Sequence, residues 1–253
     1  MLQQSGTSTF AARIEKILER VEYRRADTQD EKEAIFRLRY EAYAREGTIP
    51  ADPSGLFFDS GDETANAWLI GVYIDGVLAS SIRLHIASRP DHWLSATEAF
   101  PDLIEPKLEE GFVILDATRQ TSRLEYTRAY PFLPLLTMRC GFVAMEHFDV
   151  DLLTGSCRVE YQAAFRRMFG SVTWGRPRPY PMLSRLHVLM AYDCKAKWAD
   201  TRVRYPFLTS TPEERRALFG RSSNAPCDLH AELTAGRSDN LGQGKQRSAT
   251  CAA

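Results

Sequence analysis

A chain of 253 residues with 44% hydrophobic and 26% charged side chains has the composition of a soluble globular protein and is long enough to bury a sizeable core. Its formal net charge of −1 excludes the strongly basic surface with which proteins wrap nucleic acids or bind membranes by charge, so we expect neither partner. The five cysteines are scattered and lack metal-ligand spacing, so we expect reduced thiols and no metal site. The sequence has no secretory start and no apolar run near the roughly 18 residues of a membrane span, which predicts a cytoplasmic protein without integral membrane association.

The N-terminal part of the chain predicts a helix, a strand and a second helix. Apolar residues at helical spacing indicate a short amphipathic helix over residues 10–20, and alternation of apolar and charged residues indicates a strand over Val21–Arg25. Asp27 offers an N-cap for a longer helix over residues 31–46, whose apolar side chains form one stripe. Residues 47–66 are rich in Gly, Pro, Asp and Ser and are typical of a loop.

A β-hairpin follows. In AWLIGVYIDGVLASSIRLHI, which begins at Ala67, two apolar runs flank Asp75 and Gly76, the dipeptide that suits a type I′ turn. The mixed segment from Ala87 to Glu110 predicts short helices and a loop.

The next segments alternate strands and helices. A buried strand is predicted over Phe112–Thr118, a largely buried helix over Pro131–Phe148 and a short strand over Asp151–Thr154. An amphipathic helix over Val159–Phe169 should end at Gly170, which suits the left-handed conformation of a C-terminal cap.

Two last strands, Ser171–Trp174 and Leu186–Tyr192, are joined by the proline-rich GRPRPYPML. From about Phe219 the composition shifts to small and polar residues, which are typical of a disordered tail. We therefore expect an α/β domain over residues 21–218, an N-terminal extension with a short helix over residues 1–20, and a disordered C-terminal tail over residues 219–253.

One core strand ends in charges. In GFVILDATRQTSRLEYTRAYPF, residues 111–132, the apolar start leads directly into Asp116, Arg119 and Arg123. The charged stretch is too short for a solvated helix face and follows too apolar a run for a linker. We interpret these charges as part of a site at the end of the strand.

The order of the elements, with a central hairpin, a parallel strand pair beside it and a helix after each later strand, resembles the GNAT acyltransferase fold. This resemblance implies a mixed central sheet with helices on both faces. The segments RLRYEAYAREG, FFD, SSIRLHI and LDATR also resemble, in that order, motifs of acyl-homoserine-lactone synthases. Their counterparts in this chain are Arg39 with Tyr43, Phe58 with Asp59, Arg83, and Asp116 with Arg119.

Two departures from the lactone synthases point to their relatives, the long-chain N-acyl amino acid synthases. Position 116 is Asp where the lactone synthases have Glu, and the Trp expected shortly after the first helix is missing. The resemblance implies transfer of a long-chain fatty acyl group from acyl carrier protein to the amine of an amino acid. Two alternatives stay open: a lactone synthase that uses S-adenosylmethionine, and a non-catalytic module that binds carrier protein or lipid.

The acyl donor is expected to arrive on a carrier protein. Acetyl-CoA members of the GNAT fold carry a glycine-rich loop whose backbone N–H groups hold pyrophosphate, whereas Arg119 to Pro131 contains no glycine. We therefore expect no permanently bound cofactor and a donor presented on the phosphopantetheine arm of acyl carrier protein. Five arginines near the expected donor entrance could meet an acidic carrier protein: Arg123, Arg128, Arg158, Arg166 and Arg167.

N-acylation needs an unprotonated amine next to a thioester carbonyl, so a proton acceptor is required. Asp116 is the first candidate, because burial at a strand end would raise its pKa toward a useful range, and Asp59 is the second. Arg39, Arg83 or Arg119 could grip the carboxylate of the amino acid with two parallel hydrogen bonds. The alternative is that Asp116 and Arg119 form a purely structural ion pair.

The remaining candidates surround the expected donor path. Strands four and five of the GNAT fold diverge, so the edge over Thr118 and Thr121 is expected to pair with the pantetheine arm. Phe142 and Val143 either wall a tunnel for the fatty chain or belong to the plain core. Tyr161 either protonates the leaving thiolate, as in many GNAT enzymes, or is a packed aromatic residue.

Three histidines lie in apolar surroundings: His85, His147 and His187. We interpret them as core histidines with satisfied hydrogen bonds rather than as bases or ligands.

Overall fold

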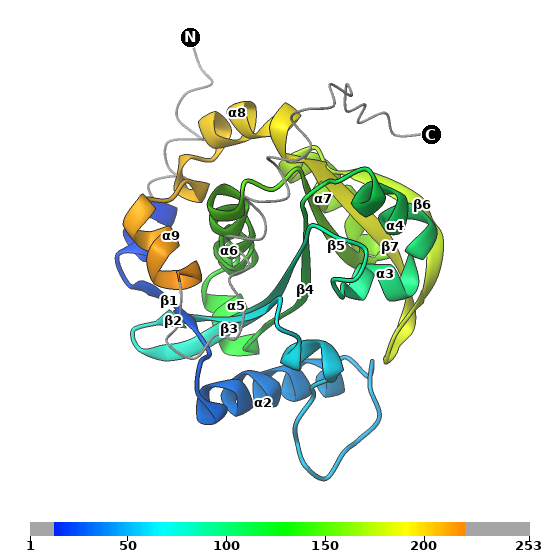
Figure 1. The fold of residues 1–253 in the computed structure, drawn as a ribbon. Coiled ribbons are helices and arrows are strands. Elements are labelled where there is room, and N and C mark those ends of the chain that lie inside the picture. The colour runs from blue at the N-terminus through cyan, green and yellow to red at the C-terminus, as the bar shows by residue number, and fades with distance from the viewer. Residues whose placement is uncertain (1–12, 221–253) are drawn as a thin grey trace.

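A single mixed sheet organises the part of the chain that the computed structural model describes, residues 13–220 (Figure 1). Its strands lie in the order β1-β2-β3-β4-β5-β7-β6, and β4 and β5 run parallel while the other neighbours run antiparallel. The strands are β1 (Val21–Arg25), β2 (Ala67–Ile74), β3 (Val77–Ala87), β4 (Ile114–Ser122), β5 (Leu152–Arg158), β6 (Val172–Tyr180) and β7 (Leu183–Asp193).

Helices cover both faces of the sheet, as predicted (Figure 1). One face carries α2 (Gln29–Arg45), α3 (Ser95–Ala99) and α4 (Pro101–Glu109). The other carries α5 (Leu124–Ala129), α6 (Leu133–Phe148), α7 (Gln162–Phe169), α8 (Cys194–Arg204) and α9 (Pro212–Phe219). Short 3-10 turns lie at η1 (Ser60–Glu63), η2 (Val159–Tyr161) and η3 (Pro206–Leu208), and residues 13–18 are helical.

The two faces of β3 differ in chemistry. Ile82, Leu84 and Ile86 belong to the large core under α6, because successive side chains of a strand point to opposite faces. Arg83 and His85, which alternate with them, point to the α2 side and contact the segment around η1. A row of polar side chains is thus buried between the sheet and α2.

Several local predictions are confirmed. β1 spans Val21–Arg25, and the hairpin turn has the positive φ angles of a type I′ turn, 50° at Asp75 and 78° at Gly76. Gly170 ends α7 in the left-handed conformation. The N-cap of α2 is Thr28 rather than Asp27, because Thr28 and Glu31 form a reciprocal capping box while Asp27 pairs with Arg25.

Strand and helix boundaries differ more in the second half. β4 continues to Ser122 and β5 to Arg158, well past the predicted ends. The proline-rich segment, predicted as a loop, lies mostly within the β6–β7 hairpin. Prolines are tolerated there because β6 is the edge strand, where a missing N–H leaves no ladder bond unmade.

The C-terminal helices extend the core beyond the predicted strands. Leu218 and Phe219 of α9 are buried, and Phe219 packs against Trp68 and Phe148. The tail predicted beyond them lies outside the described residues from position 221 onward.

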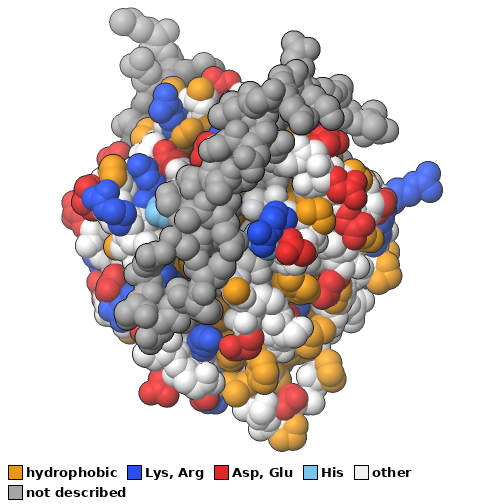
Figure 2. Space-filling model, viewed as in Figure 1, with side chains coloured by type: hydrophobic (Ala, Val, Ile, Leu, Met, Phe, Trp, Pro, Cys, Tyr) orange, Lys and Arg blue, Asp and Glu red, His pale blue; other side chains and the backbone are white. Residues whose placement is uncertain are grey.

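Among residues 13–220, no helix combines the length and the apolar character needed to span a bilayer. Acidic and basic side chains are interspersed over the described part of the face in Figure 2.

Candidate active site

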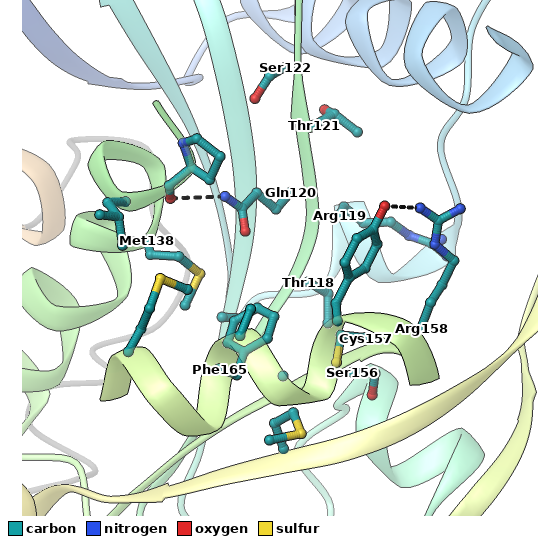
Figure 3. A pocket seen from close by; sticks show the side chains of 18 of the residues that line it. Thr118, Arg119, Gln120, Thr121, Ser122, Met138, Ser156, Cys157, Arg158 and Phe165 are labelled. Carbon is teal, nitrogen blue, oxygen red and sulfur yellow. Dashed lines mark hydrogen bonds between the residues drawn. The ribbon is translucent and has the colours of Figure 1, made fainter. Parts of the chain in front are cut away.

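A cavity opens where β4 and β5 part. The two strands pair only from Ile114 to Asp116 against Leu152 to Thr154, and the ladder then ends. Gly155 follows at the point of divergence, where a Cβ atom would lie 3.0 Å from the carbonyl oxygen of Ala117. The cavity of about 860 Å³ occupies the resulting gap, which is within the range of sites for small molecules (Figure 3).

One part of this cavity is apolar. It lies on the α6 face of the sheet and is lined from α6, α7, β5 and β7. Figure 3 shows Met138 of α6 and Phe165 of α7 among the side chains that line it. The apolar lining residues include Leu135, Met138, Phe142, Leu153, Phe165, Met168, Phe169 and Met190.

The other part is polar and lies toward α2. Arg119, Arg158 and His187 line it together with Tyr43 and Tyr180. Arg158 lies over the ring of Tyr161, with its guanidinium carbon 4.6 Å from the ring centre, and donates to the Tyr161 hydroxyl (Figure 3). The cavity therefore joins an apolar region on one face of the sheet to a cationic region on the other.

Beside the polar part, Asp59 joins two of the predicted arginines. Arg83 Nη1 donates to Asp59 Oδ1 at 2.5 Å, and Arg119 Nη2 donates to Asp59 Oδ2 at 2.6 Å. Burial raises the pKa of Asp59, but the two guanidiniums outweigh it and hold the pKa at about 2. Asp59 is therefore ionised at neutral pH, and so low a pKa makes it a weak proton acceptor.

A second ion pair extends this cluster to α2. Arg39 Nη1 donates to Asp62 Oδ1 at 2.7 Å, both side chains being fully buried, and the same oxygen lies 3.1 Å from Arg83 Nη1. Asp62 was not among the predicted site residues. The spacing of Asp59 and Asp62 was the available signal, because the two residues form a reciprocal cap on η1.

Arg119 has hydrogen-bonding capacity left over. Its side chain is only 3% exposed, yet Nε and Nη1 donate to no group in the described part of the chain. Although burial lowers it, Tyr43 and Asp59 raise the pKa of Arg119 above its ordinary value, so the guanidinium stays charged. Buried charged donors without a partner are costly, so a small shift of this side chain that brought them to a carboxylate in the cavity would be favourable.

A β-bulge brings Arg119 to this position. The pairing of β3 with β4 shifts between Ser81 and Arg83, and Arg119 adopts a left-handed φ of 54° opposite the shift. In a regular strand, Arg119 and its neighbour Thr118 would point to opposite faces. Here both reach the same cluster, since Thr118 Oγ1 accepts from Arg83 Nε at 3.3 Å.

Asp116 is fully buried but does not pair with Arg119. Its two carboxylate oxygens accept from the Ala96 backbone N–H at 2.9 Å and from Thr154 Oγ1 at 3.2 Å. The structural ion pair of Asp116 with Arg119 that the sequence left open is therefore not formed, because the bulge turns Arg119 to Asp59. Burial raises the pKa of Asp116 to about 6, as predicted from its place on a core strand.

The other predicted residues divide between the cavity and its surroundings. Thr118, Thr121, Phe142, Tyr43 and Tyr161 line the cavity.

Two predicted residues lie elsewhere. Phe58 is 53% exposed and stacks on Phe36, because the turn into η1 directs its ring away from the cluster. Val143 is buried in the core under α6 and is not among the lining residues, since it lies on the helix face turned to the sheet core.

The histidines also divide. His85 is a core histidine, as predicted, but only one of its ring nitrogens is satisfied. Nε2 lies 2.8 Å from the carbonyl oxygen of Gly61, whereas Nδ1 has no partner in the described part of the chain, and burial lowers the pKa of the ring to about 3. His187 instead lines the cavity, which the sequence did not indicate because the β5–β7 pairing that places it is non-local.

The sequence profile of the family described as N-acyl amino acid synthase FeeM matches residues 34–193. The chain belongs to this family. As a member of the FeeM family the chain is an acyltransferase, which excludes the non-catalytic alternative. No curated protein sequence gives a significant match.

Solved structures agree with the family. FeeM, an N-acyl amino acid synthase from uncultured soil microbes, is similar with a TM-score of 0.61 and 16% identity, over 74% of this chain and 98% of that chain. The CoA-dependent acyl-homoserine lactone synthase BjaI is similar with a TM-score of 0.52 and 16% identity, over 82% of this chain and 92% of that chain. These likenesses confirm the predicted GNAT-like fold of this FeeM family member.

Proposed function

We propose that the protein transfers a long-chain fatty acyl group from the thioester of acyl carrier protein to the amine of an amino acid, giving an N-acyl amino acid. The observation that carries this proposal is the two-sided cavity at the divergence of β4 and β5. Its apolar part suits a fatty chain, and its cationic part suits an acceptor with a carboxylate. The thioester would lie between them, where the strands part.

The divergent strand edges suit the donor arm. Beyond Asp116 and Thr154 the two strands no longer pair with each other, so backbone groups of β4 and β5 face the gap. The amides of a phosphopantetheine arm can pair with such edges as an added strand would. The absence of glycine between Arg119 and Pro131 favours a carrier protein over free CoA as the source of this arm.

Arg119 is the proposed anchor of the acceptor. It lines the cavity, it is held by Asp59, and its buried Nε and Nη1 have no partner in the described part of the chain. Arg83 and Arg39 pair with Asp59 and Asp62 and are not among the residues that line the cavity, so we assign them to holding the cluster together. Holding the carboxylate fixes the amine of the acceptor relative to the thioester.

The apolar part of the cavity is the proposed site of the acyl chain. Each methylene removed from water there contributes about 0.8 kcal/mol, so a long chain would bind more tightly than an acetyl group. Phe142, Phe165 and Met168 are well placed for this contact. The carboxylate of Asp116, the predicted proton acceptor, does not line the cavity.

The direct test is to incubate the purified protein with palmitoyl-acyl carrier protein and a mixture of the standard amino acids, and to search for products by mass spectrometry. A mass equal to palmitate joined to an amino acid, absent without enzyme, supports the proposal and names the acceptor. Product with palmitoyl-CoA but not with the carrier would contradict the carrier as donor. Product only with S-adenosylmethionine, as an acyl-homoserine lactone, would replace the proposal by the lactone synthase alternative.

A further inference from the structure

His187 stands at the polar part of the cavity. It lies on β7 opposite Arg158 of β5 and Arg178 of β6, and only 7% of it is exposed. Its ring lies against that of Tyr180, with the ring centres 5.0 Å apart. Since both rings line the same cavity as Arg119, an acceptor bound through Arg119 would have His187 as a neighbour.

The hydrogen bonding of His187 fixes its tautomer. Nδ1 lies 2.9 Å from the backbone carbonyl oxygen of Arg185, which can only accept a hydrogen bond. Nδ1 must therefore carry the proton. In the neutral ring, Nε2 then has a free lone pair and can only accept a proton.

The surroundings of His187 favour the neutral ring. Burial lowers its pKa below the ordinary value, and the nearby cations Arg119 and Arg158 lower it further. The Arg185 carbonyl and the carboxylate of Glu160 act in the opposite direction but do not outweigh these causes. The ring is thus ready to accept a proton at neutral pH.

Asp116, the predicted base, is less well placed for the same task. Both of its oxygens already accept hydrogen bonds, from Ala96 and Thr154, and its side chain is fully buried outside the cavity lining. A proton from the acceptor amine would therefore have to leave the cavity to reach Asp116. His187 itself lines the cavity.

We propose that His187 is the proton acceptor of the acyl transfer. This inference rests on the proposed function. The neutral amine attacks the thioester carbon, and a C–N bond forms. Nε2 takes one proton from the attacking nitrogen. The C–S bond then breaks, and the imidazolium donates this proton to the departing sulfur. The products are an amide and a thiol, and the ring is neutral again.

His187→Asn is the matched variant, because its side-chain amide can still donate to the Arg185 carbonyl but has no group at the position of Nε2. We expect kcat for N-acyl amino acid formation to fall on the order of 10²-fold or more, with little change in KM for the amino acid. The fall in rate below the pKa of the wild-type histidine should be absent in the variant. Added imidazole should restore turnover to His187→Gly. His147→Asn, a change on α6 away from the cavity lining, is the control.

Three results would overturn the inference: a kcat within about threefold of wild type, a loss confined to KM, or an unchanged acidic limb of the pH profile. The proposed function fails separately, because it predicts turnover by the wild-type protein itself. If His187→Asn does not fold, ¹⁵N NMR of the histidine rings in the wild-type protein decides the matter. A proton on Nδ1 supports the inference, and a neutral ring with the proton on Nε2 excludes it.

Discussion

Asp116 shows how burial changes a single carboxyl group. Its pKa is raised to about 6 because no solvent reaches it, so folding favours the protonated form. A group whose folded pKa lies above its unfolded value of 3.8 stabilises the fold most at low pH, and this contribution is lost as pH rises through about 6. Between pH 4 and pH 7 the loss should be about 1–3 kcal/mol.

Asp116→Asn should remove this pH dependence, since an amide keeps an acceptor for the Ala96 N–H and never ionises. We expect the free energy of unfolding of wild type, relative to the variant, to fall steadily over this pH range in urea titrations. Asp27→Asn, at an exposed carboxylate, should leave the pH dependence as in wild type. A constant difference between Asp116→Asn and wild type would show that the buried carboxyl group does not titrate there.

Arg119 makes a different residue-level prediction. A lysine at position 119 can still form an ion pair with Asp59, but it lacks the planar guanidinium that holds a second carboxylate with two parallel hydrogen bonds. Hydrogen bonds to charged groups contribute about 1.5–3 kcal/mol, so Arg119→Lys should raise KM for the amino acid roughly 10- to 100-fold. Steady-state kinetics at saturating acyl donor measure this, with Arg178→Lys at the exposed pair with Asp102 as the control. Equal KM values for both variants would remove Arg119 as the carboxylate anchor.

At the scale of elements, the bulge in β4 is the feature that assembles the site, and it stores strain. A non-glycine residue with φ of 54° costs on the order of 1–3 kcal/mol, which glycine would relieve. Arg119→Gly should therefore be more stable than Arg119→Ala by about 1 kcal/mol, the reverse of the usual order within a strand. At the adjacent Gln120, which has no positive φ, alanine should be the more stable substitution. Thermal unfolding of the four variants tests this, and the same order at both positions would contradict the strain.

Local elements were predictable from the sequence where short-range rules decide them. The Asp75–Gly76 turn, β1 and the Gly170 cap depend on a few neighbouring residues and were correctly predicted. The bulge at Arg119 and the extension of β5 to Arg158 depend on pairing with distant strands, which no local pattern contains. For the same reason the sequence suggested that Arg119 could pair with Asp116, its neighbour in the chain, rather than with Asp59.

At the scale of the whole molecule, the order of the motifs predicted which residues would lie close together but not which role each of them has. Arg39, Asp59, Arg83 and Arg119 come from α2, the η1 segment, β3 and β4, and they do form one buried cluster. Their roles follow from which of them lines the cavity and which pairs with a carboxylate outside its lining, and that depends on the folded geometry. His187 was left out because it belongs to none of the motifs.

The outer surface of α7 is where we expect the carrier protein to dock. Ala164, Phe165 and Met168 of this helix line the cavity, while Arg166 and Arg167 on the same helix are exposed. An acidic carrier whose arm enters the cavity would therefore lie against these arginines, and complementary charge speeds and strengthens such an encounter. Arg167→Glu should raise KM for acyl-acyl carrier protein on the order of tenfold at low salt, and less at high salt because ions screen exposed charges.

A neutral acyl-pantetheine separates carrier docking from chemistry, because it enters the same gap without the carrier's charges. Its KM should be the same for Arg167→Glu and wild type. Arg216→Glu on α9 changes the net charge equally at an exposed site outside the cavity lining, so it should alter neither donor's KM. If Arg216→Glu weakens the carrier as much as Arg167→Glu does, net charge rather than the surface of α7 guides the donor. If neither variant matters, the carrier approaches the gap from another side of the cavity mouth.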